Sequence, residues 1–270
     1  MKRLLVLTIP LFLLTSCLND VVSNILYPYS EPNKHKVPDT PPSPLEKMDI
    51  KGKNRETVGW YYRLNMSAPV VIYFHGNGEN LQTLFEGHFF QMMNSFQVNY
   101  AVFDYPLYGL STGELNEKGV LQAGQDVIDF VKAQYPGLPI VLWGQSLGCA
   151  PATILTSKNQ DVVKKLIVTS PWDEFWREIK FKANLDDSTC KDLAKGNEYL
   201  SDVASQSITI PVLIHHGTED EVVKFDLGKH LSESFANNSK NVTFVPVPGY
   251  HHNDILIDSV VKQINAFIHQ

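Results

Sequence analysis

Residues 141–150, VLWGQSLGCA, place one serine between two glycines directly after an apolar run. The apolar run predicts a buried strand, and the residues after Ser146 predict a helix. A strand that turns at once into a helix strains the backbone at the turn, and side chains two residues to either side would collide there. Gly144 and Gly148 have no such side chains. The stretch therefore predicts a sharp turn that holds the Ser146 hydroxyl above the edge of a sheet.

Strand and helix patterns alternate along the chain on both sides of this turn. Because the apolar runs are nearly continuous, their strands are expected to be buried on both faces and joined by crossover helices. The predicted fold class is α/β, with a mostly parallel central sheet and helices on both faces. The predicted strands span residues 56–64, 69–76, 100–106, 139–144, 165–171, 211–217 and 242–249, and the predicted helices span residues 80–96, 119–136, a segment after Ser146, 224–235 and 254–268.

Four of the predicted strands end in short polar motifs. These are HGNGEN (75–80), GQSLG (144–148), HGTEDEVV (216–223) and YHHND (250–254). In a parallel sheet the carboxyl ends of the strands meet at one edge, where ligands bind. A serine, an acid and a histidine, in that chain order, are therefore expected at the same edge. The alternative interpretation is a tight turn that carries an idle serine.

Taken together, these motifs resemble those of the α/β-hydrolases, in particular the Bem46-like group of serine hydrolases that includes the ABHD13 and ABHD17 proteins. The resemblance covers about residues 49–270. GQSLG resembles the nucleophile elbow, HGTEDEVV the acid turn and HHND the histidine turn. The stretch DYPLYGLSTG (104–113) resembles a loop of the group, but it has Pro106 and Leu107 where the group has arginine and glycine. The difference at Pro106 and Leu107 affects the expected conformation of this loop. It does not affect the nucleophile, acid and histidine turns.

The resemblance implies a serine hydrolase with a catalytic triad. Ser146 would attack an acyl carbonyl, a histidine would accept the proton of the serine, and Asp220 would orient that histidine. The family motif places the histidine directly before Asn-Asp, at His252. The neighbouring His251 is the alternative.

Two backbone N–H groups are expected to form the oxyanion hole that such a reaction needs. One belongs to Leu147, at the start of the helix that follows the serine. The family pattern points to Asn77 for the other.

The interval from residue 171 to residue 210 leaves room for one or two helices, so a small or absent lid is expected. Its aromatic side chains Trp172, Phe175 and Trp176 either line an acyl pocket or pack the helix onto the sheet. The two interpretations stay open at this point.

Neither a metal site nor a cofactor is predicted. His215 and His216 are neighbours on a predicted strand, so their side chains point to opposite faces and offer at most one ligand between them. The same argument applies to His251 and His252, which also offer at most one ligand between them. His75 is expected to be a structural member of its turn.

The N-terminal residues have the organisation of a secretory signal. A basic start precedes an apolar stretch, residues 4–16, that is too short to span a bilayer as a helix. The stretch ends in LTSC, which resembles the lipobox of bacterial lipoproteins and implies cleavage after residue 16 and acyl chains on Cys17. An ordinary cleaved signal is the alternative. Proline-rich residues 17–47 are expected to form a tether, and residues 48–270 to form the hydrolase domain.

The implied location is the bacterial cell envelope, with the chain anchored in the membrane through lipidated Cys17. In a Gram-negative host the outer membrane is favoured, because Leu18 stands where an aspartate is associated with inner-membrane retention. Export would permit a disulfide between Cys149 and Cys190, although two unpaired core cysteines are the favoured interpretation.

The formal net charge of −6 and the absence of a long basic run argue against a nucleic-acid partner. The predicted function is that of a membrane-anchored serine hydrolase that cleaves the ester or thioester bond of a small-molecule or lipid-like substrate through an acyl-enzyme. The alternatives are a serine peptidase of the same fold, a non-catalytic lipoprotein that uses the fold as a binding module, and a structural component of the envelope.

Overall fold

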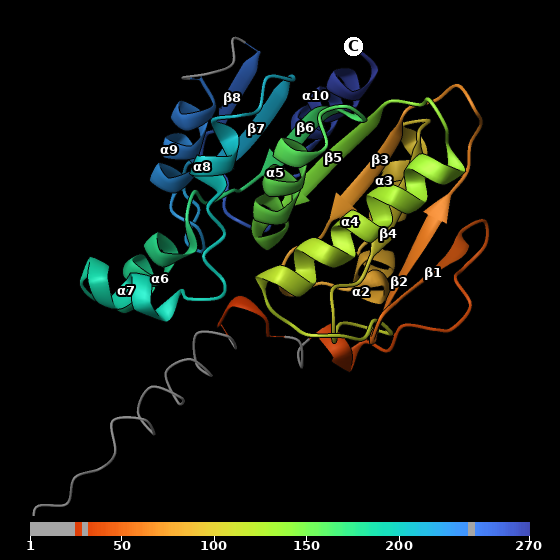
Figure 1. Ribbon diagram of the computed structural model, residues 1–270. Helices are drawn as coiled ribbons and strands as arrows, with labels where there is room; N and C mark the ends of the chain where they lie inside the picture. The colour runs from red at the N-terminus through yellow and green to blue at the C-terminus, as the bar shows by residue number, and fades with distance from the viewer. Residues whose placement is uncertain (1–24, 29–31, 237–240) are drawn as a thin grey trace, which may run out of the picture.

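The computed structural model describes residues 25–28, 32–236 and 241–270. Its centre is an eight-stranded sheet in the order β1-β2-β4-β3-β5-β6-β7-β8 (Figure 1). The first two strands are antiparallel to each other, β2 is antiparallel to β4, and the strands from β4 to β8 run parallel. The strands are β1 (Glu46–Gly52), β2 (Arg55–Tyr62), β3 (Val70–Phe74), β4 (Asn99–Phe103), β5 (Ile140–Gln145), β6 (Val163–Thr169), β7 (Val212–Gly217) and β8 (Val242–Val247). The predicted α/β class is confirmed.

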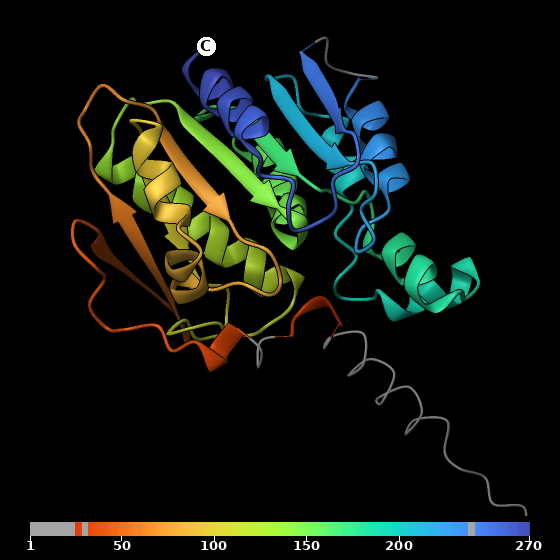
Figure 2. The ribbon, with the colours of Figure 1, turned by 180° about the vertical axis from the view of Figure 1, so that it is seen from behind.

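Helices cover both faces of the sheet (Figures 1 and 2). One face carries α4 (Glu117–Gln134), α5 (Cys149–Lys158), α8 (Ser201–Ser205) and α9 (Phe225–Ala236). The other face carries α2 (Leu81–Glu86), α3 (Phe89–Ser95) and α10 (Asp258–His269). Among the helices of the described residues, none is both long and apolar enough to cross a membrane.

Strand β3 shows why the apolar runs are continuous. All five of its side chains are buried. Val70, Ile72 and Phe74 belong to the core on one face, and Val71 and Tyr73 to the core on the other. Because successive side chains point to opposite faces, a strand covered on both sides needs an apolar residue at every position.

The helix predicted over residues 80–96 is divided into α2 and α3. Asn80 caps α2 by accepting a hydrogen bond from the backbone N–H of Thr83. The helix ends at Gly87, and His88 adopts a left-handed conformation with φ of 64° before α3 begins. Both short helices face the same core, so the apolar spacing continues across the break. The periodicity of the sequence therefore does not reveal that the helix is divided.

The described part of the segment predicted to form a tether, residues 17–47, contacts the hydrolase domain. Leu26, Tyr27 and Val37 are buried, and the Tyr27 hydroxyl lies 2.6 Å from that of Tyr199. Apolar side chains between the prolines pack onto the domain, so this segment forms part of its surface. The predicted signal peptide and Cys17 lie outside the described residues.

Both described cysteines, Cys149 and Cys190, are buried and unpaired. The Cys149 thiol donates to the carbonyl oxygens of Gly144 and Thr169, at 3.2 Å each. Cys149 thus behaves as a small core residue directly below the turn at Ser146, and the disulfide alternative does not apply to this structure.

Candidate active site

The turn at Ser146 has the sharp geometry that its glycines predict. Ser146 follows β5, opens the short turn η2 (Ser146–Gly148) and has a φ of +52°. A Cβ atom at Gly148 would collide with the carbonyl oxygen of Phe74, and one at Gly144 would collide with the carbonyl oxygen of Gly148. Both obstacles are backbone atoms, one in the neighbouring strand β3 and the other in the turn itself, so neither can move aside without shifting that backbone.

Replacing Gly148 with alanine is therefore expected to destabilise the domain by about 1–3 kcal/mol, the scale of an overpacked core. The matched control is Gly78→Ala, because an added Cβ there meets no atom within 4 Å. The free energy of unfolding in urea measures both variants. Equal stability of the two would contradict the account of the turn.

The three residues predicted for the triad come together at the carboxyl edge of the sheet. His252 Nδ1 lies 2.7 Å from Asp220 Oδ2, and His252 Nε2 lies 2.9 Å from Ser146 Oγ. The serine follows β5, the aspartate follows β7 and the histidine follows β8, and all three are buried. Because a carboxylate can only accept, Nδ1 carries the hydrogen and Nε2 is free to accept the serine proton.

Asp220 is held by more partners than His252 alone. Its Oδ1 accepts hydrogen bonds from the backbone N–H groups of Val222 and Val223, at 3.0 and 2.8 Å. Burial by itself would raise its pKa, but the hydrogen bonds from His216, His252 and Val223 outweigh this effect and keep the pKa below the usual range. The side chain is therefore an anion at neutral pH, suited to stabilise a protonated His252.

His216 is a positioning residue that the sequence interpretation left without a role. Its Nε2 lies 3.3 Å from Asp220 Oδ2 and 3.0 Å from the carbonyl oxygen of Val223. Both neighbours are acceptors, so Nε2 carries the hydrogen and ties the acid to its own turn. The sequence feature that could have indicated this role is the position of His216 at the end of β7, four residues before Asp220.

The other candidate histidines lie elsewhere. His251 is exposed, and the hydrogen bond to Glu221, at 2.9 Å, raises its pKa. His215 contacts Gln263 at 2.9 Å. His75 is fully buried and contacts the carbonyl oxygen of its neighbour Gly76, and burial lowers its pKa to about 4. Within the described ranges, no group of three or more His, Cys, Asp or Glu side chains is arranged to hold a metal ion.

The two predicted oxyanion donors border the same small cavity as Ser146. Leu147 is the next residue in the turn. Asn77 lies in the loop after β3, where its carbonyl oxygen accepts a hydrogen bond from the Tyr108 hydroxyl at 2.9 Å. The Glu79 carboxylate stabilises this loop by accepting a hydrogen bond from the backbone N–H of Gly76, at 2.7 Å.

The cavity beside Ser146 is small and covered. Its volume is about 30 Å³, close to the space that one water molecule takes in the liquid. Part of the cover is the N-terminal segment, where the carbonyl oxygen of Ile25 accepts a hydrogen bond from the Asn77 side chain at 3.2 Å. The lining residues are Ile25, Leu26, Asn77, Ser146, Leu147, Trp172, Phe175, Glu178, Lys182, Val222 and Val223.

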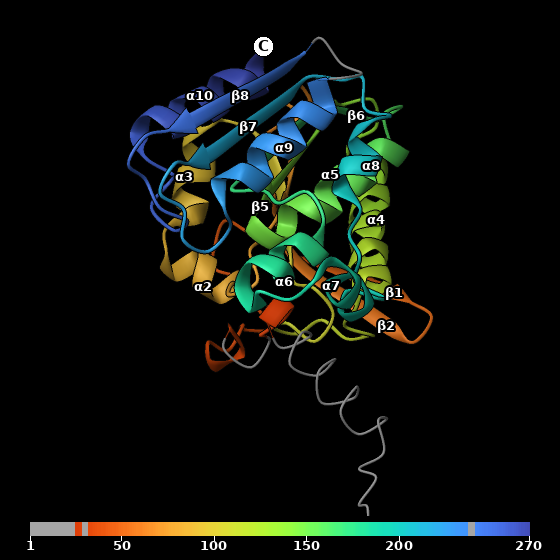
Figure 3. The same cartoon turned by 90° about the vertical axis from the view of Figure 1, so that its left-hand side faces the viewer.

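A small helical insertion between β6 and β7 forms the rest of the cover. It contains α6 (Phe175–Ala183) and α7 (Asp187–Leu193), which lie at the same edge of the molecule as the described N-terminal segment (Figure 3). Trp172 and Phe175 line the cavity and also belong to the core on one face of the sheet. Trp176 does not line the cavity, and its indole donates to Glu174 at 2.6 Å.

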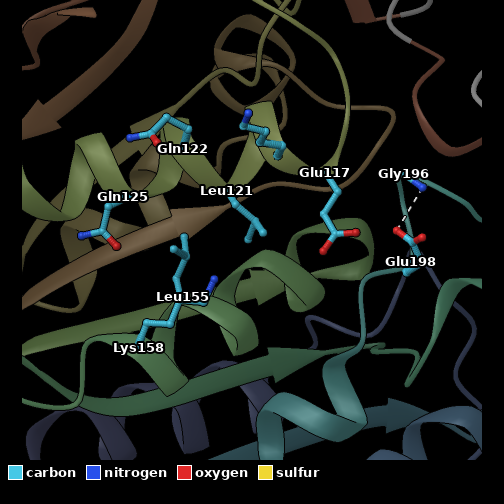
Figure 4. Close-up of a pocket in the computed structure, with 9 residues that line it drawn as sticks. Glu117, Leu121, Gln122, Gln125, Leu155, Lys158, Gly196 and Glu198 are labelled. Atoms are coloured by element: carbon cyan, nitrogen blue, oxygen red, sulfur yellow. Dashed lines mark hydrogen bonds between the residues drawn. The ribbon is translucent and has the colours of Figure 1, made fainter.

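A larger cavity of about 510 Å³ lies away from this site. Figure 4 shows it between α4, α5 and the loop that contains Gly196 and Glu198. Its lining side chains are glutamates, glutamines, lysines and leucines, and none of the predicted site residues belongs to it.

Comparisons with known proteins agree with this fold. A family model described as the alpha/beta hydrolase fold matches residues 69–186. The lysophosphatidylserine lipase ABHD12 of Xenopus tropicalis is 30% identical over 241 residues, which are 80% of this chain and 61% of that protein. The uncharacterized protein R595 of Acanthamoeba polyphaga mimivirus is 32% identical over 71% of this chain and 69% of its own length. The chain thus spans less than two thirds of the ABHD12 protein.

Solved structures show the same architecture. The Pyrococcus furiosus esterase Pf2001 superimposes with a TM-score of 0.68 at 18% identity, covering 86% of this chain and 93% of the esterase. Est1E from Butyrivibrio proteoclasticus has the same TM-score and identity, with 83% and 97% covered. With its mostly parallel sheet, its nucleophile turn and these likenesses, the chain belongs to the α/β-hydrolase superfamily.

Proposed function

We propose that this protein is a serine hydrolase that cleaves carboxylic ester or thioester bonds through an acyl-enzyme. The observation that carries the proposal is the unbroken chain of hydrogen bonds from Ser146 through His252 to Asp220. The name of one relative, a lysophosphatidylserine lipase, supports an ester as the bond that is broken.

The reaction follows from the positions of these atoms. Ser146 Oγ attacks the acyl carbon, and its proton passes to His252 Nε2. The carbonyl oxygen becomes an oxyanion, and the backbone N–H groups of Leu147 and Asn77 are the donors that we assign to it. The proton on His252 then goes to the leaving alcohol or thiol as its bond to the acyl carbon breaks. Water, activated by the same imidazole, releases the acid and restores Ser146.

The charge of the buried acid supports the proton transfers. When His252 becomes positively charged, the ionised carboxylate of Asp220 lies 2.7 Å away. The backbone N–H groups of its own turn hold that carboxylate in place. The protein therefore does not have to reorganise around the new charge, and this lowers the barrier.

The apolar wall of the cavity favours a substrate with an acyl chain of small to medium length. Ile25 and Leu26 of the N-terminal segment border this cavity together with Trp172 and Phe175 of the insertion. The lid formed by α6 and α7 is small, and this agrees with a substrate whose alcohol part reaches the solvent.

Labelling with a fluorophosphonate tests the proposal without knowledge of the substrate. The wild-type chain should be labelled and should hydrolyse p-nitrophenyl butyrate. A folded chain that does neither is a non-catalytic binding module of the same fold. Hydrolysis of a peptide amide in preference to the ester would identify a serine peptidase instead.

We also propose that residues 1–16 are a lipoprotein signal and that Cys17 is acylated, which would place the protein in the bacterial cell envelope. The support is the sequence LTSC and its resemblance to a lipobox. Kinship to the Bem46-like group is likewise a proposal, supported by the motifs at the strand ends. An alkyne fatty acid fed to the cells should label the wild type and not Cys17→Ala, and equal labelling of both would exclude the anchor.

A further inference from the structure

The turn that carries Asn77 consists largely of flexible residues. It spans residues 76–79, GNGE, shortly after β3, and two of its four residues are glycines. A Cβ atom at Gly78 would meet no atom within 4 Å, so packing does not hold the outer side of the turn. Glycine leaves more backbone conformations open than any other residue. The direction of the N–H groups in this turn therefore depends on the hydrogen bonds that the turn makes.

Glu79 binds Gly76, the first residue of this turn, in two ways. Its Oε2 accepts a hydrogen bond from the backbone N–H of Gly76 at 2.7 Å. Its own backbone N–H donates to the carbonyl oxygen of Gly76 at 3.3 Å. The ring of His75 lies against the same carbonyl oxygen, with Nδ1 at 2.7 Å. Both backbone polar groups of Gly76 are thus held, and Glu79 contacts each of them.

The held carbonyl group sets the direction of the Asn77 N–H. The peptide between Gly76 and Asn77 is planar and trans, so its C=O and its N–H point in opposite directions. The next carbonyl group, that of Asn77, is held as well, because the Tyr108 hydroxyl donates to it at 2.9 Å. The Asn77 N–H therefore cannot turn away unless the bonds to Gly76 are broken.

The Glu79 carboxylate lies beside the reacting groups. A Cβ atom on Gly76 would lie 3.2 Å from Glu79 Oε2 and 3.7 Å from the Cβ atom of Ser146, so the carboxylate and the nucleophile flank the same glycine. Burial raises the pKa of Glu79, and the Gly76 N–H and the charge of His252 oppose this rise. A negative charge at this place would favour a protonated His252 but disfavour the oxyanion. The hydrogen bond to Gly76 has no such drawback.

We propose that Glu79 is a positioning residue of the oxyanion hole, which acts through Gly76 to direct the Asn77 N–H at the oxyanion. This inference rests on the proposed ester hydrolysis at Ser146 and on the assignment of Asn77 as a donor. An oxyanion hole is complementary to the tetrahedral intermediate and less so to the planar ester. Loss of the Glu79 hydrogen bond should therefore lower kcat and leave KM close to that of the wild type.

Three variants of Glu79 separate its hydrogen bond from its charge. Glu79→Ala removes the acceptor, so kcat for p-nitrophenyl butyrate should fall by about 10- to 100-fold, no more than the loss of a whole oxyanion donor, with KM within about threefold. Glu79→Gln loses the charge but keeps an oxygen that can accept from Gly76, so kcat should stay within about threefold of the wild type. Glu79→Asp keeps the charge but withdraws the oxygens, and it should behave like Glu79→Ala.

A transition-state analogue tests the oxyanion hole directly. The carbonyl carbon of 1,1,1-trifluoropentan-2-one bonds to Ser146 Oγ, the serine proton passes to His252, and the carbonyl oxygen becomes the oxyanion. Its inhibition constant should rise in Glu79→Ala by the same factor by which kcat/KM falls, and Glu79→Gln should restore it. The matched control is Glu86→Ala on α2, because Glu86 is exposed and contacts His35 at 2.8 Å. Its kinetics should equal those of the wild type.

Unchanged kcat in Glu79→Ala overturns the inference. Equal losses in Glu79→Ala and Glu79→Gln overturn it as well, because they assign Glu79 to a charge effect on His252. If urea unfolding shows that Glu79→Ala does not fold, the other two variants carry the test, and a Glu79→Asp variant that is faster than Glu79→Gln contradicts the inference.

The wild type separates this failure from that of the proposed function. If it hydrolyses the ester and is labelled by a fluorophosphonate while the Glu79 variants miss these expectations, only the inference fails. If the wild type does neither, both fail.

Discussion

Replacing Ser146 with alanine is expected to reduce the turnover of p-nitrophenyl butyrate by about 10⁴-fold or more, since residues of a triad act as a unit. The same change should abolish labelling by a fluorophosphonate, because the probe bonds to Oγ. The free energy of unfolding should shift by about 1 kcal/mol or less, because the contact that Oγ makes is the one with His252 at 2.9 Å. Steady-state kinetics and urea unfolding measure the two effects.

A serine on α5, the helix that follows the turn, provides the control. Ser157 lies in α5, and its hydroxyl donates to the carbonyl oxygen of Ile154 at 2.7 Å. Ser157→Ala should keep the wild-type rate and labelling. If Ser146→Ala is still labelled at the wild-type rate, the catalytic role of Ser146 is wrong even though the fold stands.

The His252→Ala variant is expected to lower kcat by about 10³-fold or more, because the imidazole carries the proton in both directions. The neighbouring His251→Ala variant should change kcat by less than about threefold, since His251 is exposed and faces Glu221. The two residues are adjacent, so the pair is a matched test of one position against the next. Hydrolysis of p-nitrophenyl butyrate by purified full-length variants measures the difference.

The opposite ranking of the two variants would mean that the loop after β8 presents His251 to the serine during turnover. Thermal unfolding of His251→Ala should remain close to that of the wild type, because His251 is exposed. His252→Ala should lower the unfolding temperature, because it removes a buried partner of the Asp220 carboxylate. The rates of the two folded variants, and not their stabilities, therefore decide the catalytic assignment.

The turn at Ser146 could be predicted from the sequence because its cause is local. A side chain at Gly144 would meet the backbone of the turn itself, and the apolar run before the turn predicts a buried strand. The obstacle at Gly148, by contrast, is the backbone of Phe74 on β3, which only the fold brings there. The meeting of Ser146 with His252, 106 residues away, could be expected as well. Parallel strands bring all their carboxyl ends to one edge, so the topology makes the long-range contact.

Other features depend on which face of a segment meets the domain, and the sequence does not state this. Tyr27 stands between Leu26 and Pro28, and its neighbours in the sequence do not show that its hydroxyl reaches Tyr199. Glu178 lies on a short helix with lysines, where a solvated carboxylate is the ordinary expectation. Its side chain is buried because α6 packs beside the cavity at Ser146. This packing depends on the tertiary structure of the insertion and not on the local sequence.

The described N-terminal segment also has a consequence for the direction in which the site faces. Ile25 borders the cavity at Ser146, and only eight residue steps separate it from Cys17. Fully extended, eight residues reach about 28 Å. A lipid on Cys17, as proposed above, would therefore keep the opening of the site close to the bilayer surface. The enzyme would then search for its substrate in the plane of the membrane, and its rate would depend on the density of substrate per unit of membrane area.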